Sequence, residues 1–146
     1  MLTPHSTAPP RGARALTDKD AVFLAALAQA TEDAILGEDA AGLIATWNRG
    51  AELLDGYSSG DAIGRPAAML VPADERAVAE AALERLRAGE PVRAFESVRL
   101  RKDGRGVPVS LTMSPAYLDG ALMGATCISR DITERRLADE QARAAS

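Results

Sequence analysis

A turn between two alternating segments restricts the fold of this chain more than any other feature. Asp103 and Gly104 mark the turn, because glycine reaches positive φ angles at low cost and an aspartate side chain hydrogen-bonds to nearby backbone. Apolar residues recur at every second position on both sides of it, at Val98, Leu100, Val107, Val109, Leu111 and Met113. The alternation predicts an antiparallel hairpin of strands 92–102 and 106–118, with these residues on the more buried face and Arg99 on the opposite one.

Turn signals and apolar periodicity predict the other elements. Three more strands are expected at 34–37, 43–47 and 122–130. Short helices are expected at 49–54, 61–63 and 67–70, and a longer helix at 72–88. Asn48 is a good N-cap for the first of these helices, and Gly64 closes the next turn. The order predicts an α+β domain, in which a five-stranded antiparallel sheet carries short helices on one face.

Both ends of the chain extend beyond this domain. Residues 1–15 are rich in proline, serine and alanine and are expected to form a disordered tail, where His5 has no second group with which to hold a ligand. The domain itself is expected at 31–132. Residues 133–146 are expected to begin a C-terminal helix, with Thr133 as its N-cap.

Residues 16–30 are expected to form an N-terminal flanking helix capped by Thr17. Helical spacing places an apolar stripe on one side of it, formed by Val22, Phe23, Ala26, Leu27 and Ala30. Such a stripe needs a partner surface. Two interpretations stay open: the helix folds back on its own sheet, or it packs against the same helix of a second subunit, and both can hold at once.

Composition narrows the functional classes. Hydrophobic residues make up 47% and charged residues 26% of the 146 positions, which is typical of one globular domain. The net charge of −4 gives no electrostatic reason to expect a nucleic-acid partner. No apolar run approaches the ~20 residues that span a bilayer, and no secretion signal begins the chain, so no membrane segment and a cytoplasmic location are expected.

The sequence lacks the motifs of an enzyme. Cys127 is the only cysteine, which excludes an intrachain disulfide and a cysteine-based metal cluster. There is no nucleophile with a general base, no motif of paired carboxylates, no phosphate-binding glycine loop and no metal-ligand spacing. We therefore expect neither catalysis nor a metal site in this chain.

Short motifs occur in a characteristic order between residues 31 and 136. They lie at 34–36, 44–52, 56–58, 63–66, 71–72, 101–104, 109–112, 114–115 and 131–135. Each is weak alone, but in this order and at these separations they are specific. The chain resembles a PAS domain, the sensor module of signalling proteins.

The resemblance implies roles for several residues. Asn48 caps the first helix after the second strand, and Asp103 and Gly104 turn the chain between the third and fourth strands. Asp131 and Thr133 match the family's exit motif, in which the two side chains tie the last strand to the outgoing signalling helix. The module is expected to form a homodimer and to pass its signal to a C-terminal effector domain.

PAS domains often hold a ligand between the sheet and the short helices. Seven residues are candidates for lining such a pocket: Trp47, Met69, Phe95, Glu96, Val98, Met113 and Cys127. Trp47 either stacks on a flavin or, as we favour, packs in the core, and the methionines and Phe95 also suit an ordinary core. Glu96 has the same strand parity as Val98, so it is expected to face inward as a polar anchor for a ligand. Its alternatives are a salt bridge with an arginine such as Arg65, or exposure.

A histidine-ligated heme and a cysteinyl-adduct flavin are not expected here. Heme-binding members use a histidine of the helical wall, whereas this chain has only His5. Blue-light members carry a reactive cysteine in an Asn-Cys-Arg-Phe-Leu-Gln motif, which is absent. Cys127 falls on the last strand, where we expect a small buried hydrophobe. The identity of any cofactor stays open.

The chain is thus expected to be a sensory PAS module. It would detect a signal or ligand and relay it through dimerisation and its C-terminal helix to a histidine kinase, a diguanylate cyclase or a similar effector. The alternative is a ligand-free module that only dimerises or docks a partner. The chain stops early in the exit helix, which is expected of a fragment, with a stand-alone protein as the other interpretation.

Overall fold

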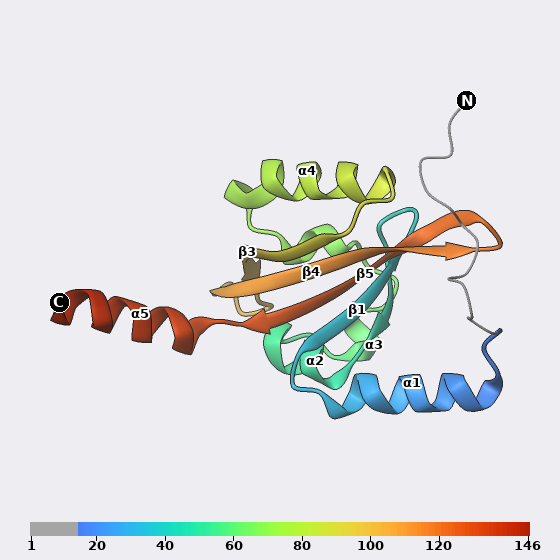
Figure 1. Ribbon diagram of the computed structural model, residues 1–146, viewed down its shortest axis with the longest axis horizontal. Coiled ribbons are helices and arrows are strands. Elements are labelled where there is room, and N and C mark those ends of the chain that lie inside the picture. Colours follow the sequence, from blue (N-terminus) through green and yellow to red (C-terminus); the bar gives the residue numbers. More distant parts are fainter. Residues whose placement is uncertain (1–14) are drawn as a thin grey trace.

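The computed structural model describes residues 15–146, which form one antiparallel sheet of five strands in the order β2-β1-β5-β4-β3 (Figure 1). The strands are β1 Ala34–Asp39, β2 Ile44–Trp47, β3 Val92–Leu100, β4 Gly106–Leu118 and β5 Ala121–Asp131. The expected α+β arrangement is confirmed. The tail expected at 1–15, with His5, lies outside the described residues apart from Ala15.

Helices cover one face of this sheet and flank it at both ends of the chain (Figure 1). They are α1 Asp18–Ala30, α2 Arg49–Asp55, α3 Ser59–Ala62, η1 Ala67–Leu70, η2 Ala73–Glu75, α4 Arg76–Arg87 and α5 Thr133–Ala145. The segment 72–88, predicted as one helix, is divided into a 3₁₀ turn and a later helix. Glu75, with φ −104° and ψ 2°, lies outside helical geometry, so α4 begins only after it.

A bulge near the start of β3 sets which of its side chains face the helices. Val92 pairs with Met113 and Phe95 pairs with Leu111, so three steps along β3 match two along β4. Ala94, inside this irregularity, has a positive φ of 49°. One extra residue in a strand reverses the alternation of every side chain that follows it.

The bulge makes the hairpin prediction right in one strand and wrong in the other. β4 alternates as predicted, and Val109 is fully buried. In β3 the predicted faces are exchanged: Arg99 lies inside and is only 6% exposed. Val98 lies on the outer face, where it lines a groove with Pro108. A period-two pattern carries no signal for one inserted residue, which is why the alternation misassigned these faces.

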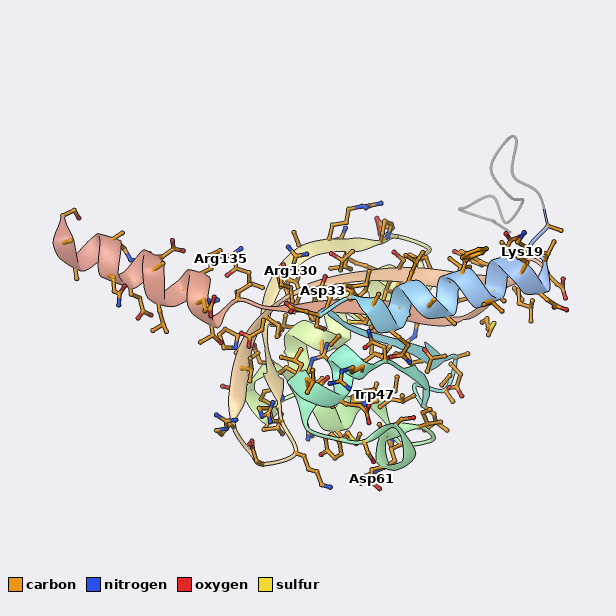
Figure 2. The ribbon with its side chains drawn as sticks, turned by 90° about the horizontal axis from the view of Figure 1, so that it is seen from below. Lys19, Asp33, Trp47, Asp61, Arg130 and Arg135 are labelled. Carbon is orange, nitrogen blue, oxygen red and sulfur yellow. The ribbon has the colours of Figure 1, made fainter. Side chains whose placement is uncertain are left out.

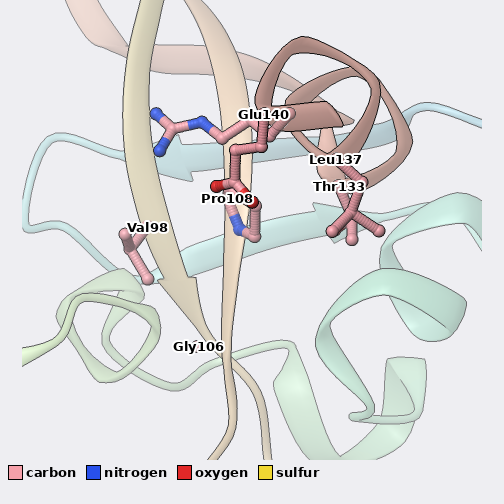
Figure 3. A pocket seen from close by; sticks show the side chains of 7 residues that line it. Val98, Gly106, Pro108, Thr133, Leu137 and Glu140 are labelled. Carbon is pink, nitrogen blue, oxygen red and sulfur yellow. The ribbon is translucent and has the colours of Figure 1, made fainter. Parts of the chain in front are cut away.

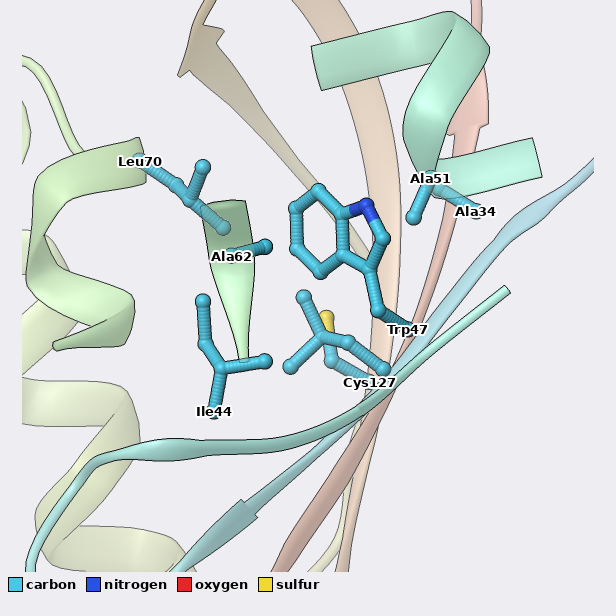
Figure 4. Packing of buried hydrophobic residues seen from close by; sticks show 8 residues of the cluster. Ala34, Ile44, Trp47, Ala51, Ala62, Leu70 and Cys127 are labelled. Carbon is cyan, nitrogen blue, oxygen red and sulfur yellow. The ribbon is translucent and has the colours of Figure 1, made fainter. Parts of the chain in front are cut away.

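The hydrophobic core lies between the inner face of the sheet and the short helices (Figure 4). Its members include Ile44 and Trp47, which are 1% and 6% exposed. The indole N–H of Trp47 donates to the carbonyl of Tyr57 at 3.0 Å, so the polar edge of this large ring is satisfied. At Gly50 a Cβ would lie 2.1 Å from the carbonyl oxygen of Asp33, so glycine allows α2 to start against the segment that leads into β1.

The first helix, α1, contributes nothing to this core. Thr17 caps it as predicted, since its hydroxyl accepts from the amide of Asp20 at 3.2 Å. None of its residues is buried, and Val22, Phe23 and Leu27 expose 68%, 59% and 66% of their surface. The interpretation in which this apolar stripe folds back on its own sheet is therefore wrong. Figure 2 shows the side chains of α1 spread around the helix.

Two glycines and one aspartate shape turns at positions singled out in the sequence. Gly64 and Gly104 have φ angles of 90° and 87°, the left-handed region that favours glycine. Asp103 accepts from the amide of Arg105 at 3.0 Å, which is the side-chain turn bond expected of aspartate. Away from these turns, Arg130 of β5 forms a salt bridge with Asp33, just before β1, at 3.2 Å (Figure 2).

Asn48 joins three parts of the chain with one buried side chain. It is 4% exposed, and its Oδ1 accepts from the amides of Ile35 and Ala51 at 2.8 and 2.9 Å. Its Nδ2 donates to the carbonyls of Asp33 and Ala28 at 3.0 and 2.5 Å. The side chain thereby caps α2 and hydrogen-bonds to the backbone of β1 and of the last turn of α1.

Replacing Asn48 should therefore cost far more than an ordinary helix cap. Asn48→Ala removes the cap of α2 and leaves buried backbone groups unpaired, so we expect a loss of about 3 kcal/mol in the free energy of unfolding. Urea denaturation followed by circular dichroism measures this loss. Arg49→Ala, at the neighbouring exposed position, serves as control and should change stability little. Equal effects of the two variants would contradict the role assigned to Asn48.

Candidate functional site

A cavity of about 720 Å³ lies between the inner face of the sheet and the helices α4 and η1. This volume is within the range of pockets that hold small molecules. Its wall is mostly apolar and is formed by both the sheet and the helices. The apolar residues include Leu36, Met69, Leu70, Leu86, Phe95, Leu111, Met113 and Cys127. The sheet supplies one side and the helices the other, so a molecule bound here would touch both.

The structure brings together most of the predicted pocket residues. Met69, Phe95, Met113 and Cys127 all line the cavity. Val98 borders the cavity but also lines the groove on the outer face of the sheet. Trp47 lies in the core cluster with Ala51, Ala62 and others.

Glu96 is placed differently from the prediction. It is exposed, and it lies on the outer face because the bulge at Ala94 reverses the alternation of β3. The expectation that Glu96 faces inward as a ligand anchor is therefore wrong. Of its alternatives, exposure and a salt bridge both apply, but the partners are arginines of the exit helix rather than Arg65.

Inside the domain, Arg99 of β3 and Asp55 of α2 form a buried ion pair. Arg99 Nε lies 3.8 Å from Asp55 Oδ1, and the two side chains are 8% and 0% exposed. Arg99 Nη2 donates to the hydroxyl of Ser129 and to Cys127 Sγ, the latter at 3.5 Å. Neither carboxylate oxygen of Asp55 has a hydrogen-bond partner. Asp55 falls one helical turn after the buried Ala51, which is the signal by which the sequence could have shown it.

Burial and charge act in opposite directions on the acids near Arg99. Burial raises the pKa of Asp55, against the opposing charges of Arg99 and then Arg101. The pKa of Glu38, which lines the cavity, is likewise raised by burial, and Arg99 again acts in the opposite direction. Arginine keeps its proton in proteins, so Arg99 is a permanent cation in the interior.

The last strand is joined to the start of α5 by hydrogen bonds to the side chain of Asp131. Asp131 Oδ1 accepts from the amide and the hydroxyl of Thr133 at 2.8 and 2.6 Å. The predicted assignment of Thr133 as N-cap is wrong, since the helix begins at Thr133 and Ile132 occupies the cap position. Ile132 is 3% exposed, and its amide donates to the carbonyl of Pro108 at 3.0 Å. The start of α5 is thereby attached to both β4 and β5.

Glu96 adds a second attachment, from β3 to α5. Its carboxylate oxygens accept from Arg135 at 2.6 Å and from Arg136 at 2.9 Å. The hydrogen bond from Arg136 contributes most to holding the pKa of Glu96 below its usual range, and Arg135 acts in the same direction. Beside this contact an open groove of about 350 Å³ separates the helix from the outer face of the hairpin, lined in part by Val98 and Leu137 (Figure 3).

A family model described as the PAS fold matches residues 23–132. The chain belongs to the PAS family. PAS domains are sensory modules of signalling proteins, and the fold class expected from the resemblance is confirmed. The family model spans the cavity, the Asp55–Arg99 pair and the end of β5, so the features described above lie within the PAS domain.

Relatives and solved structures agree with this assignment. "Two-component system protein A" of Emericella nidulans is 35% identical over 118 residues, which cover 73% of this chain but only 16% of that protein. The PAS domain of a protein from Colwellia psychrerythraea has 32% sequence identity and a TM-score of 0.72, covering 78% of this chain and 98% of that one. The PAS domain of an HTR-like protein from Haloarcula marismortui has 25% identity and a TM-score of 0.65, covering 79% and 93%.

Among residues 15–146, no helix is long and apolar enough to cross a membrane. In the same part of the chain, no cluster of three or more histidine, cysteine or acidic side chains is arranged to hold a metal ion.

The Asp55–Arg99 pair predicts an asymmetric response to mutation. Arg99→Gln leaves a buried carboxylate without its opposing charge, so we expect a loss of roughly 3 kcal/mol in the free energy of unfolding at neutral pH. The double variant Asp55→Asn with Arg99→Gln removes both charges and should recover most of that loss. Denaturant unfolding of both variants measures the difference.

The same series carries a pH signature. The pKa of Asp55 is raised in the folded protein, so folding favours its protonated form and stability is lost as the pH rises through that pKa. The deficit of Arg99→Gln should therefore shrink as the pH falls toward the carboxyl range. A deficit that stays constant with pH, or a double variant as unstable as the single one, would contradict a charge-based origin.

The Glu96 contact predicts that the attachment of α5 depends on pH. Because the folded-state pKa of Glu96 is lowered, its contribution is present at neutral pH and is lost as the pH falls through that lowered value. Glu96→Gln should loosen the first turn of α5 at pH 7, and its effect should diminish as the pH falls below the ordinary range of a glutamate. Backbone ¹⁵N relaxation of residues 134–137 measures this, with Glu134→Gln as an exposed control. An acid-independent effect would contradict the ionic attachment.

Proposed function

We propose that this PAS domain is a cytoplasmic sensory module that binds a small ligand and relays the event through α5 to an effector, such as a histidine kinase or a diguanylate cyclase. One observation carries the proposal: one face of β3 lines the cavity, and its opposite face binds α5. Phe95 and Ser97 line the cavity, and Glu96 between them binds Arg135 and Arg136.

Strand geometry supplies the mechanism. Successive side chains of a strand point to opposite faces, so a displacement of β3 by a molecule in the cavity also displaces Glu96. The ion pairs with α5 then strengthen or weaken. Asp131 and Thr133 act at the other attachment, where they tie α5 to β5. A ligand that favours one position of β3 would shift the population of helix orientations.

The relative in Emericella nidulans supports a signalling context. It is named as a two-component system protein, and this chain matches about a sixth of its length, 16%. We infer that this PAS domain serves such a system, with catalysis supplied by an effector and not by the PAS domain. A histidine-ligated heme or a cysteinyl flavin adduct does not fit our proposal, since His5 is the only histidine and Cys127 lies on β5.

A second candidate function rests on α1. Its exposed Val22, Phe23 and Leu27 form an apolar surface outside the core, which favours packing against another copy of the helix. We propose that the module is a homodimer joined in part through α1. If the cavity binds nothing, dimerisation or partner docking becomes the whole function, which is the ligand-free alternative.

Native mass spectrometry of the purified chain beside a denatured run of the same sample tests these functions. For a small-molecule sensor we expect extra mass in the native spectrum that disappears on denaturation. A dimer without extra mass, in a sample from cells and after incubation with a metabolite extract, would leave only the ligand-free function.

The dimer has its own control in this experiment. Phe23→Glu places a charge on the apolar surface of α1 and should convert dimer to monomer, whereas Lys19→Gln on the same helix should not. A ligand mass retained by the Phe23→Glu monomer would show that sensing and dimerisation are separable. A dimer unaffected by Phe23→Glu would contradict the role of α1.

A further inference from the structure

We infer that the cavity recognises an apolar molecule carrying one anionic group, with Arg99 as the residue that binds that group. The inference rests on the proposed sensory function and goes beyond it by naming the chemistry of the ligand. It depends on three features: the apolar composition of the cavity wall, the hydrogen-bond donors that Arg99 leaves unused, and the interactions of Arg99 with the nearby acids Asp55 and Glu38.

The wall of the cavity favours an apolar body. Met69, Leu70, Phe95, Leu111 and Met113 meet there, and burial of a hydrocarbon surface against them is favourable. The exposed border of the cavity carries charges of both signs, from Arg65, Arg76, Arg87, Asp39 and Glu80. Deeper inside, Arg99 supplies a cation that is more than nine-tenths buried.

Arg99 retains hydrogen-bonding capacity in this structure. Only its Nη2 donates hydrogen bonds, to Ser129 and Cys127. Nε lies 3.8 Å from Asp55, which is a charge contact but too long for a hydrogen bond. Within the described residues Nη1 has no hydrogen-bond partner, although Arg99 lines the cavity. A carboxylate or a similar oxyanion matches the planar donors of a guanidinium and forms charge-assisted bonds with it.

The acids near Arg99 leave its unused hydrogen-bond donors free for an anion. Asp55 contributes an opposite charge but no hydrogen bond, and burial disfavours its ionised form. Glu38 is subject to the same desolvation. A bound anion would disfavour ionisation of both acids further, because like charges close together raise each other's pKa. Arg99 stays charged throughout, and its unused Nη1 remains available for a negative group.

Calorimetric titration of the full chain with matched acid and alcohol probes tests the inference. Octanoate and octan-1-ol represent a flexible body, and benzoate and benzyl alcohol represent a compact aromatic one. We expect one of the acids to bind more tightly than its alcohol, and Arg99→Gln to weaken that acid by about tenfold or more while leaving the alcohol unchanged. Arg105→Gln, in the exposed turn, is the control and should bind like the parent chain.

Three outcomes would decide the matter. The double variant Asp55→Asn with Arg99→Gln removes both charges of the buried pair and leaves no unpaired carboxylate at position 55, so the same loss of acid binding in that variant excludes misfolding as the cause. Alcohols that bind as well as acids, with no effect of Arg99→Gln, would overturn the anionic group but leave the cavity as a ligand site. If no probe binds and native spectra show no ligand mass, the sensory function fails together with this inference.

Discussion

One extra residue in β3 decides which side chains meet the cavity and which meet the exit helix. Because of the bulge at Ala94, Arg99 lies inside beside Asp55, and Glu96 lies outside beside Arg135. Val92 before the bulge and Arg99 after it both lie on the inner face, although they are an odd number of positions apart. The proposed ligand chemistry and the proposed relay thus depend on the same local irregularity.

The buried pair shows how such an arrangement is tolerated. A guanidinium in the interior is stabilised by an opposite charge and by hydrogen bonds, and Arg99 has Asp55 for the first and Ser129 for the second. Asp55 is held by α2, whose start is fixed by Asn48. The capping network therefore positions the carboxylate that accompanies the cation. A ligand that engages Arg99 would act on α2 as well as on the sheet.

The sequence was sufficient for the architecture and for much of the cavity wall. Asn48 and the Asp103–Gly104 turn are strong local signals, and the apolar residues Met69 and Met113 lie where the strand and helix order places them. It was insufficient for β3, since a period of two continues unbroken through a bulge. Asp55 was missed for a related reason: a carboxylate in a helix is read as solvent-facing unless its partner is known, and Arg99 is 44 positions away, from 55 to 99.

The order of strands has a mechanical consequence. β3 is the edge of the sheet and is paired only with β4, whereas β5 at the centre is paired on both sides. Moving an edge strand stretches one ladder of hydrogen bonds, while moving a central strand stretches two. The strand that carries Phe95 toward the cavity and Glu96 toward α5 is therefore easier to displace, whereas β5 with Asp131 is held more rigidly.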